Sequence, residues 1–264
     1  MRHFTLLVGL GMSVIAAEAC AARPQRPVAS AAVANAADTL RRLLAEGHPV
    51  DEVNAGGLTP LMWAARYGAI DTMTILLDAG ADVQARDTHN VWTPLLHAIH
   101  TQRAVAVRLL LERGADANAA TPNGITPLLM AADDPDPSTV KALLEYGANP
   151  RVEGPGGATP LTQAVSGGAM TDIDRPLLGG CRPATVRALL EHDPTLRVPQ
   201  TFAGHQALWW ARFHGCGEVL NAVDFQAANA IRRVGDVDLE EAVRNARPQD
   251  GSSPTPATGD PVRR

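Results

Sequence analysis

A triplet of threonine, proline and leucine recurs four times along this chain, and it limits the possible folds more than any other feature of the sequence. The copies begin at Thr59, Thr93, Thr126 and Thr159, so successive copies are 33 or 34 residues apart. A constant period of this length indicates that one supersecondary unit is repeated, and that each copy buries its apolar face against its neighbours.

Each residue type in the repeated unit has a physical role in a pair of helices. A threonine before a helix accepts a hydrogen bond from an N–H group of the first turn, and proline is tolerated at the first helical position because its missing N–H has no partner there. A second apolar stretch ends in a leucine pair such as Leu76 and Leu77. Gly80 then adopts the left-handed conformation that closes the second helix. The sequence therefore predicts an all-α solenoid in which helix, turn, helix and extended loop alternate.

The repeated unit resembles that of the ankyrin repeat family. The family pattern of Gly-x-Thr-Pro-Leu, Ala-Ala, Leu-Leu and Gly-Ala-Asp is nearly complete from Gly57 to Ala85 and again from Gly124 to Asn149, and the resemblance covers about Ala29 to Asp224. It implies an ankyrin repeat α-solenoid with hairpin-like fingers, about five repeats and helical caps. It also implies a protein partner, no cofactor and no intrinsic catalysis.

The unit is regular in the middle of the chain and irregular at both ends. Before the first triplet, Val33 to Glu46 is expected to form the second helix of an incomplete repeat. After the fourth triplet the distance to the next leucine pair grows by about 13 residues, and in the following repeat Gln206, Ala207 and Leu208 replace the triplet. The expected organisation is a capping half repeat at 29–54, repeats beginning near 55, 88, 121 and 154, an insertion at 167–182, a degenerate repeat at 201–224, a C-terminal cap at 225–247 and a disordered tail at 248–264.

The first residues have the layout of a secretory signal. A basic start at Met1 to His3 is followed by the apolar run Phe4 to Ala17 and then by small residues, which predicts a signal peptide at 1–21 ahead of a repeat domain at 22–247. The short signal and the bias toward Ala, Arg and Pro suggest a bacterial periplasmic protein. A lipoprotein is the alternative, because Cys20 could carry a lipid.

Export would leave two cysteines in the mature protein. Cys181 lies in the insertion, and Cys216 lies at the turn between the two helices of the next repeat. Equivalent points of adjacent repeats stack about 10 Å apart, and a flexible insertion could bring the two within bonding distance. We therefore expect a Cys181–Cys216 disulfide in an oxidising compartment, with two separate buried thiols as the alternative.

Composition and motifs argue against several other functions. A net charge of −5 without a dense basic cluster gives no attraction to nucleic acid. No motif for catalysis, phosphate or zinc is present.

Three weaker groups of side chains have structural explanations. His97 and His100 could share a metal, but a structural His97 beside a surface His100 is favoured. The acidic group from Asp133 to Asp136 fits a helix boundary, with Asp136 or Ser138 as N-cap, better than a calcium site. Of Trp209 and Trp210, one is expected to face the core and the other to be partly exposed, with an aromatic ligand platform as the alternative.

The resemblance implies that partners bind to the finger tips and to exposed positions late in each first helix, on the concave face. Tyr, Trp, Phe and Arg are enriched among the side chains that dominate interface energetics. Ordinary solvated surface is the alternative for these positions. They are Arg66, Tyr67, His100, Thr101, Asp133, Asp134, Ser166, Phe213 and His214 on the first helices, and His89, Asn90, Trp92, Asn123, Phe202 and His205 on the fingers.

Together these features predict a non-catalytic protein–protein interaction module in the bacterial periplasm. The alternative is an immunity-like inhibitor that blocks a toxic or lytic enzyme of the cell envelope. An enzyme would need titratable groups that converge in a pocket, and the open face of a solenoid rarely provides one.

Overall fold

The structure is a computed structural model, and it describes residues 27–54, 56–167 and 180–223. The chain divides into two units, Met1–Val223 and Asp224–Arg264, and every described residue belongs to the first. The expected signal peptide, the C-terminal cap, the tail and most of the insertion fall outside the described residues, so these expectations stay predictions.

The described residues form pairs of helices and contain no β-strand. In each pair the two helices are joined by a tight turn, and a longer loop leads to the next pair. The pairs are α2 (Pro27–Val33) with α3 (Ala37–Ala45), α4 (Pro60–Tyr67) with α5 (Ile70–Asp78), α6 (Pro94–His100) with α7 (Ala104–Glu112), α8 (Pro127–Ala131) with α9 (Ser138–Glu145), and α10 (Pro160–Ser166) with α11 (Pro183–His192). A sixth repeat begins with α12 (Phe202–Phe213), and residues 217–223 after it are also helical.

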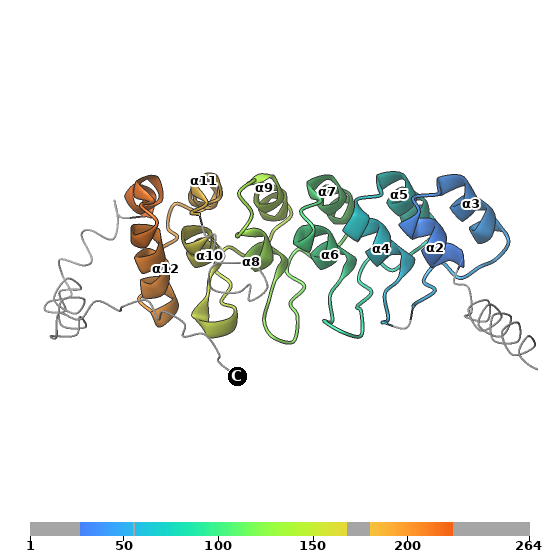
Figure 1. Ribbon diagram of the computed structural model, residues 1–264, viewed down its shortest axis with the longest axis horizontal. Coiled ribbons are helices and arrows are strands. Elements are labelled where there is room, and N and C mark those ends of the chain that lie inside the picture. Colours follow the sequence, from blue (N-terminus) through green and yellow to red (C-terminus); the bar gives the residue numbers. More distant parts are fainter. Residues whose placement is uncertain (1–26, 55, 168–179, 224–264) are drawn as a thin grey trace, which may run out of the picture. The chain divides into compact units, whose positions relative to one another are not determined.

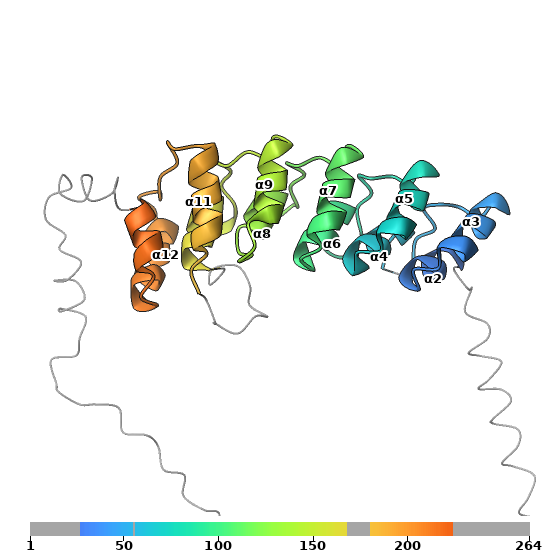
Figure 2. The ribbon, with the colours of Figure 1, turned by 90° about the horizontal axis from the view of Figure 1, so that it is seen from above.

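Within this unit the pairs stack in chain order. The first helices lie in one row and the second helices in another, as Figure 1 and the perpendicular view in Figure 2 show. The long loops project from the row of first helices (Figure 1), and we call these loops the fingers. This arrangement agrees with the all-α solenoid that the period predicts.

The four triplets begin helices in the predicted way. Helices α4, α6, α8 and α10 each start at the proline, and each preceding threonine accepts a hydrogen bond of 3.2 to 3.4 Å from the backbone N–H three residues later. A cap of this kind stabilises a helix by about 1 kcal/mol.

Leucine and alanine fill the space between successive pairs. The leucine of each triplet is at most 1% exposed, and an alanine three residues later lets neighbouring helices approach closely. These residues are Leu61, Leu95, Leu128 and Leu161 with Ala64, Ala98, Ala131 and Ala164.

The first repeat is more complete than the sequence predicted. The expected single helix from Val33 to Glu46 is wrong, because α2 ends at Val33 and α3 begins only at Ala37. Asn35 adopts the left-handed conformation with φ of 50°, which closes α2 and turns the chain. Val28 and Ala32 are buried, and α2 packs on α4, so the half repeat expected at 29–54 has both of its helices.

The last described repeat differs in where its first helix starts. Helix α12 begins at Phe202, with the side chain of Thr201 accepting a hydrogen bond from the backbone N–H of Gly204 at 3.3 Å. Because Ala207 replaces the proline of the other repeats, the helix continues without a break through the position where the triplet would be. Phe202 and His205 therefore lie on α12, and their expected place on a finger is wrong.

The structure contains the disulfide between Cys181 and Cys216. The two Cα atoms lie 6.1 Å apart, which suits a disulfide. Cys181 precedes α11, and Cys216 follows α12, so the bond joins the fifth helix pair to the repeat after it.

Candidate protein-binding surface

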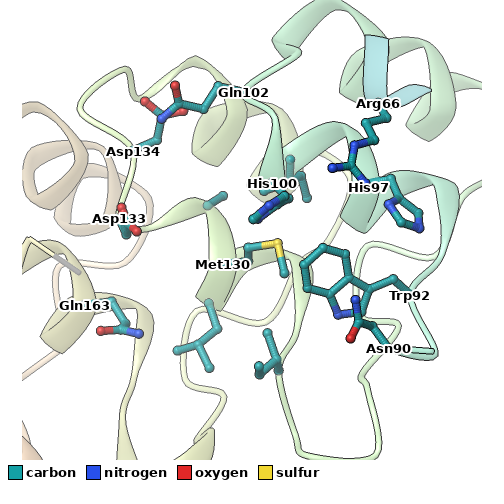
Figure 3. A pocket seen from close by; sticks show the side chains of 14 residues that line it. Arg66, Asn90, Trp92, His97, His100, Gln102, Met130, Asp133, Asp134 and Gln163 are labelled. Atoms are coloured by element: carbon teal, nitrogen blue, oxygen red, sulfur yellow. The ribbon is translucent and has the colours of Figure 1, made fainter. Parts of the chain in front are cut away.

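A hollow of about 400 Å³ opens between finger residues and the first helices α6, α8 and α10. Six of the predicted binding residues line it, and they come from four different elements of the chain. Asp133 lies at one end of this hollow and Trp92 and Asn90 at the other, with His100 between them (Figure 3). The six residues are Arg66, Asn90, Trp92, His100, Asp133 and Asp134.

Other residues of the hollow were not singled out from the sequence. Met130 and Gln163 line it, and each follows the threonine of its triplet by four residues, as His97 does. Trp63 occupies the same position in the first triplet repeat, where it stacks on Tyr67 with ring centroids 6.0 Å apart. The position four residues after each threonine was therefore the signal that could have found them.

Asp87 organises the finger that carries Trp92. Its carboxylate is 4% exposed and accepts hydrogen bonds from the backbone N–H groups of His89 at 2.8 Å, Asn90 at 2.7 Å and Trp92 at 3.2 Å. The Nε2 atom of the buried His97 lies 3.0 Å from the second carboxylate oxygen. Asp87 therefore links the finger to helix α6, and His97 has the structural role expected of it.

The environment sets the charge of this buried pair. Burial lowers the pKa of His97, and the hydrogen bond and charge of Asp87 offset this only in part. Burial alone would raise the pKa of Asp87, but the hydrogen bonds from Asn90, His89 and His97 together bring it below its ordinary value. At neutral pH the pair is thus a neutral imidazole that donates its Nε2–H to a carboxylate.

The finger with Trp92 is one residue longer than its neighbours. It closes with a hydrogen bond from the N–H of Asp87 to the carbonyl of Trp92, five residues on, whereas the next finger closes from Thr121 to Ile125, four residues on. Val91 has a φ of 58°, while Gly57, Gly124 and Gly157 hold the equivalent left-handed positions of the other fingers. A β-branched residue is strained there, so the turn that directs Trp92 toward the hollow is made at the expense of stability.

Replacing Val91 with glycine is expected to raise the free energy of unfolding by roughly 0.5 to 1 kcal/mol, because glycine adopts positive φ without a steric penalty. Urea unfolding followed by circular dichroism measures this difference. The matched control is Val105→Gly in the first turn of α7, where φ is helical and a loss of about 0.5 to 1 kcal/mol is expected. Equal losses in the two variants would show that Val91 is not strained.

Two predicted binding residues have structural roles instead. The hydroxyl of Thr101 donates to the carbonyl of Arg66 at 2.8 Å and so links two neighbouring repeats. Ser166 is buried, and its hydroxyl donates to the carbonyl of Gln163 at 3.2 Å. The remaining predicted residues are exposed but lie outside the hollow: Tyr67, His89, Asn123, Phe202, His205, Phe213 and His214.

Helix α12 carries a cluster of aromatic side chains. Trp209 stacks on Phe213 with centroids 5.3 Å apart, and Trp210 stacks on His214 at 5.3 Å. Trp209 is 45% exposed and Trp210 is half-buried, so the expectation that one of them faces the core is wrong. The reason is that neither is covered by a following helix pair among the described residues.

The acidic group after α8 forms a helix boundary. Helix α8 ends at Ala131 and α9 begins at Ser138, with Pro137 rather than Asp136 or Ser138 at the N-cap position. Asp136 contributes instead by accepting hydrogen bonds from the N–H of Ser138 at 3.0 Å and from its hydroxyl at 2.8 Å.

Two searches of the described ranges bear on other functions. Within 27–54, 56–167 and 180–223, no three His, Cys, Asp or Glu side chains come together as metal ligands would. Over the same ranges, no helix has the length and apolar character needed to cross a membrane.

Comparison with known proteins identifies the repeat. A family model described as ankyrin repeats in three copies matches residues 28–121, 85–154 and 104–181, which together cover more than half of the chain. This chain belongs to the ankyrin repeat family. Ankyrin repeats are protein–protein interaction modules that present an extended surface built from successive repeats, and the hollow around Trp92 lies on such a surface.

Curated relatives share the ankyrin repeats over short stretches. Over 75 residues the chain is 36% identical to the ankyrin repeat and SAM domain-containing protein 6 of Rattus norvegicus, which is 28% of this chain and 8% of that protein. Over 71 residues it is 38% identical to the B-cell lymphoma 3 protein homolog of Mus musculus, which is 27% of this chain and 16% of that protein. Over 85 residues it is 34% identical to the glycerophosphocholine phosphodiesterase gde1 of Schizosaccharomyces pombe, covering 32% and 8%. The chain therefore spans less than a fifth of these relatives.

Proposed function

We propose that this ankyrin repeat protein is a non-catalytic binding module, and that it holds a segment of a protein partner in the hollow around Trp92. The observation that carries this proposal is the placement of Trp92. Its indole lies 5.0 Å from the ring of His100 and 5.5 Å from that of His97, and its finger is fixed by the buried Asp87 carboxylate. A rigid, partly exposed tryptophan beside polar side chains is typical of an interface anchor.

Affinity purification from a cell-envelope extract tests this proposal. The full chain should recover a partner, and Trp92→Ala should weaken its binding by about thirtyfold, since truncating an anchor costs 2 kcal/mol or more. The control is Tyr146→Ala, which removes an aromatic side chain that is 42% exposed but lies outside the hollow. Equal recovery by all three proteins would place the binding surface elsewhere.

We further propose that the protein acts in the bacterial periplasm, after removal of a signal peptide at 1–21. The disulfide between Cys181 and Cys216 supports an oxidising compartment, because disulfides persist there and are rare in the cytosol. The partner would then be another protein of the cell envelope.

Cell fractionation tests the location. The protein is expected in the soluble periplasmic fraction, shortened by about 19 to 21 residues. Fatty-acid labelling at Cys20 would favour the lipoprotein alternative, and recovery of an unprocessed chain from the cytoplasm would contradict export.

A further inference from the structure

We infer that the hollow binds its partner through a basic side chain, a lysine or arginine in an extended segment, which lies over Trp92 and Met130 and directs its charge toward Asp133 and Asp134. This inference rests on the proposed function and names the chemistry of the partner. Both ends of such a side chain have a counterpart in the hollow, as the next two observations explain.

The charges that line the hollow are unequal. Asp133 and Asp134 contribute two carboxylates at one end, and Arg66 contributes one guanidinium near the other (Figure 3). His97 adds no positive charge at neutral pH because burial lowers its pKa. The chain as a whole has a net charge of −5. The field at the acidic end therefore favours a basic side chain and disfavours an acidic one.

The floor between the two ends suits the stem of a long basic side chain. The side chains of Met130 and Trp92 lie between Asp133 and Asn90 (Figure 3). Lysine and arginine bury their methylene groups on apolar surface and keep their charge in a polar environment, and an arginine also stacks on an aromatic face. Because Asp87 fixes the finger of Trp92, little conformational freedom is lost on binding.

The carboxylates are carried by a rigid segment. The backbone carbonyl of Asp133 accepts a hydrogen bond from Nε of Arg182 at 2.5 Å, and that of Asp134 accepts one from the hydroxyl of Thr185 at 2.8 Å. Both bonds use main-chain oxygens, so a change from aspartate to asparagine at these positions removes charge and retains the bonds that hold the segment.

Selection of peptides from a random library of twelve-residue sequences displayed on phage, with the full chain as target, tests the inference. Selected peptides should contain a lysine or arginine, and changing that residue to glutamine should weaken binding by about tenfold. The double variant Asp133→Asn/Asp134→Asn should weaken binding by a similar factor, and added salt should reduce the difference. Glu112→Gln removes a charge outside the hollow and should leave binding unchanged.

The outcomes separate this inference from the proposed function. Peptides that lose binding to Trp92→Ala but bind the double asparagine variant normally would support the hollow and overturn the basic side chain. Peptides that bind Trp92→Ala as tightly as the unchanged protein would overturn both. A selection without enrichment of basic residues, or one that yields no binder beyond those of an unrelated protein, would also overturn the inference. Thermal unfolding of each variant identifies any loss of folding.

Discussion

Replacing Asp87 with alanine is expected to lower the free energy of unfolding by about 4 kcal/mol. The carboxylate is buried and accepts three backbone hydrogen bonds as well as one from His97. Its removal leaves several buried donors without an acceptor, and the loss of one partner from a buried pair costs about 3 to 5 kcal/mol. Urea unfolding followed by circular dichroism measures the change.

The control for this prediction is Asp116→Ala. Asp116 also accepts a backbone hydrogen bond, from Asn118 at 2.8 Å, but it is exposed in its turn, so a loss below about 1 kcal/mol is expected. If the two alanine variants lose the same stability, Asp87 does not organise the finger of Trp92.

Breaking the Cys181–Cys216 disulfide is expected to lower the free energy of unfolding by up to about 3.8 kcal/mol, the value that the chain-entropy model gives for a closed loop of this length. The bond spans 35 residues of sequence, and both cysteines pack against the core. The loss would be concentrated in the last described repeats, because repeat units depend mainly on their neighbours. Urea unfolding with and without a reductant measures it.

A variant with serine at both cysteine positions serves as the control, since a reductant should not change its stability. Non-reducing mass spectrometry of protein isolated from the periplasm provides an independent check. Free thiols at both positions in that protein would contradict the disulfide and remove a main support for export.

The regular part of the fold was predictable because it depends on local chemistry. A threonine cap followed by proline fixes where a helix starts, and the first helices α4, α6, α8 and α10 begin as expected. Helix α2 was missed because it lacks the triplet, and its Ala-rich sequence contains no break that a pattern could detect before Asn35. Helix α12 was misplaced because the missing proline at Ala207 lets it start earlier.

The candidate site was predictable only in part. The family resemblance indicated Arg66, Trp92 and Asp133, but it could not show that residues from four elements meet in one hollow. The spacing of 34 residues rather than 33 was visible in the sequence. Its consequence was not, because the extra residue acts through the left-handed Val91 and the buried Asp87.

Site-specific photo-crosslinking in living cells tests the central claim most directly. A photoreactive phenylalanine derivative replaces Trp92 in one strain and Tyr146 in another, and covalent adducts are identified by mass spectrometry after irradiation. The account predicts one dominant protein adduct from position 92, with the contact in an extended segment, and none of that protein from position 146. No adduct at position 92, or the same adducts from both positions, would contradict the claim that the hollow around Trp92 binds the partner.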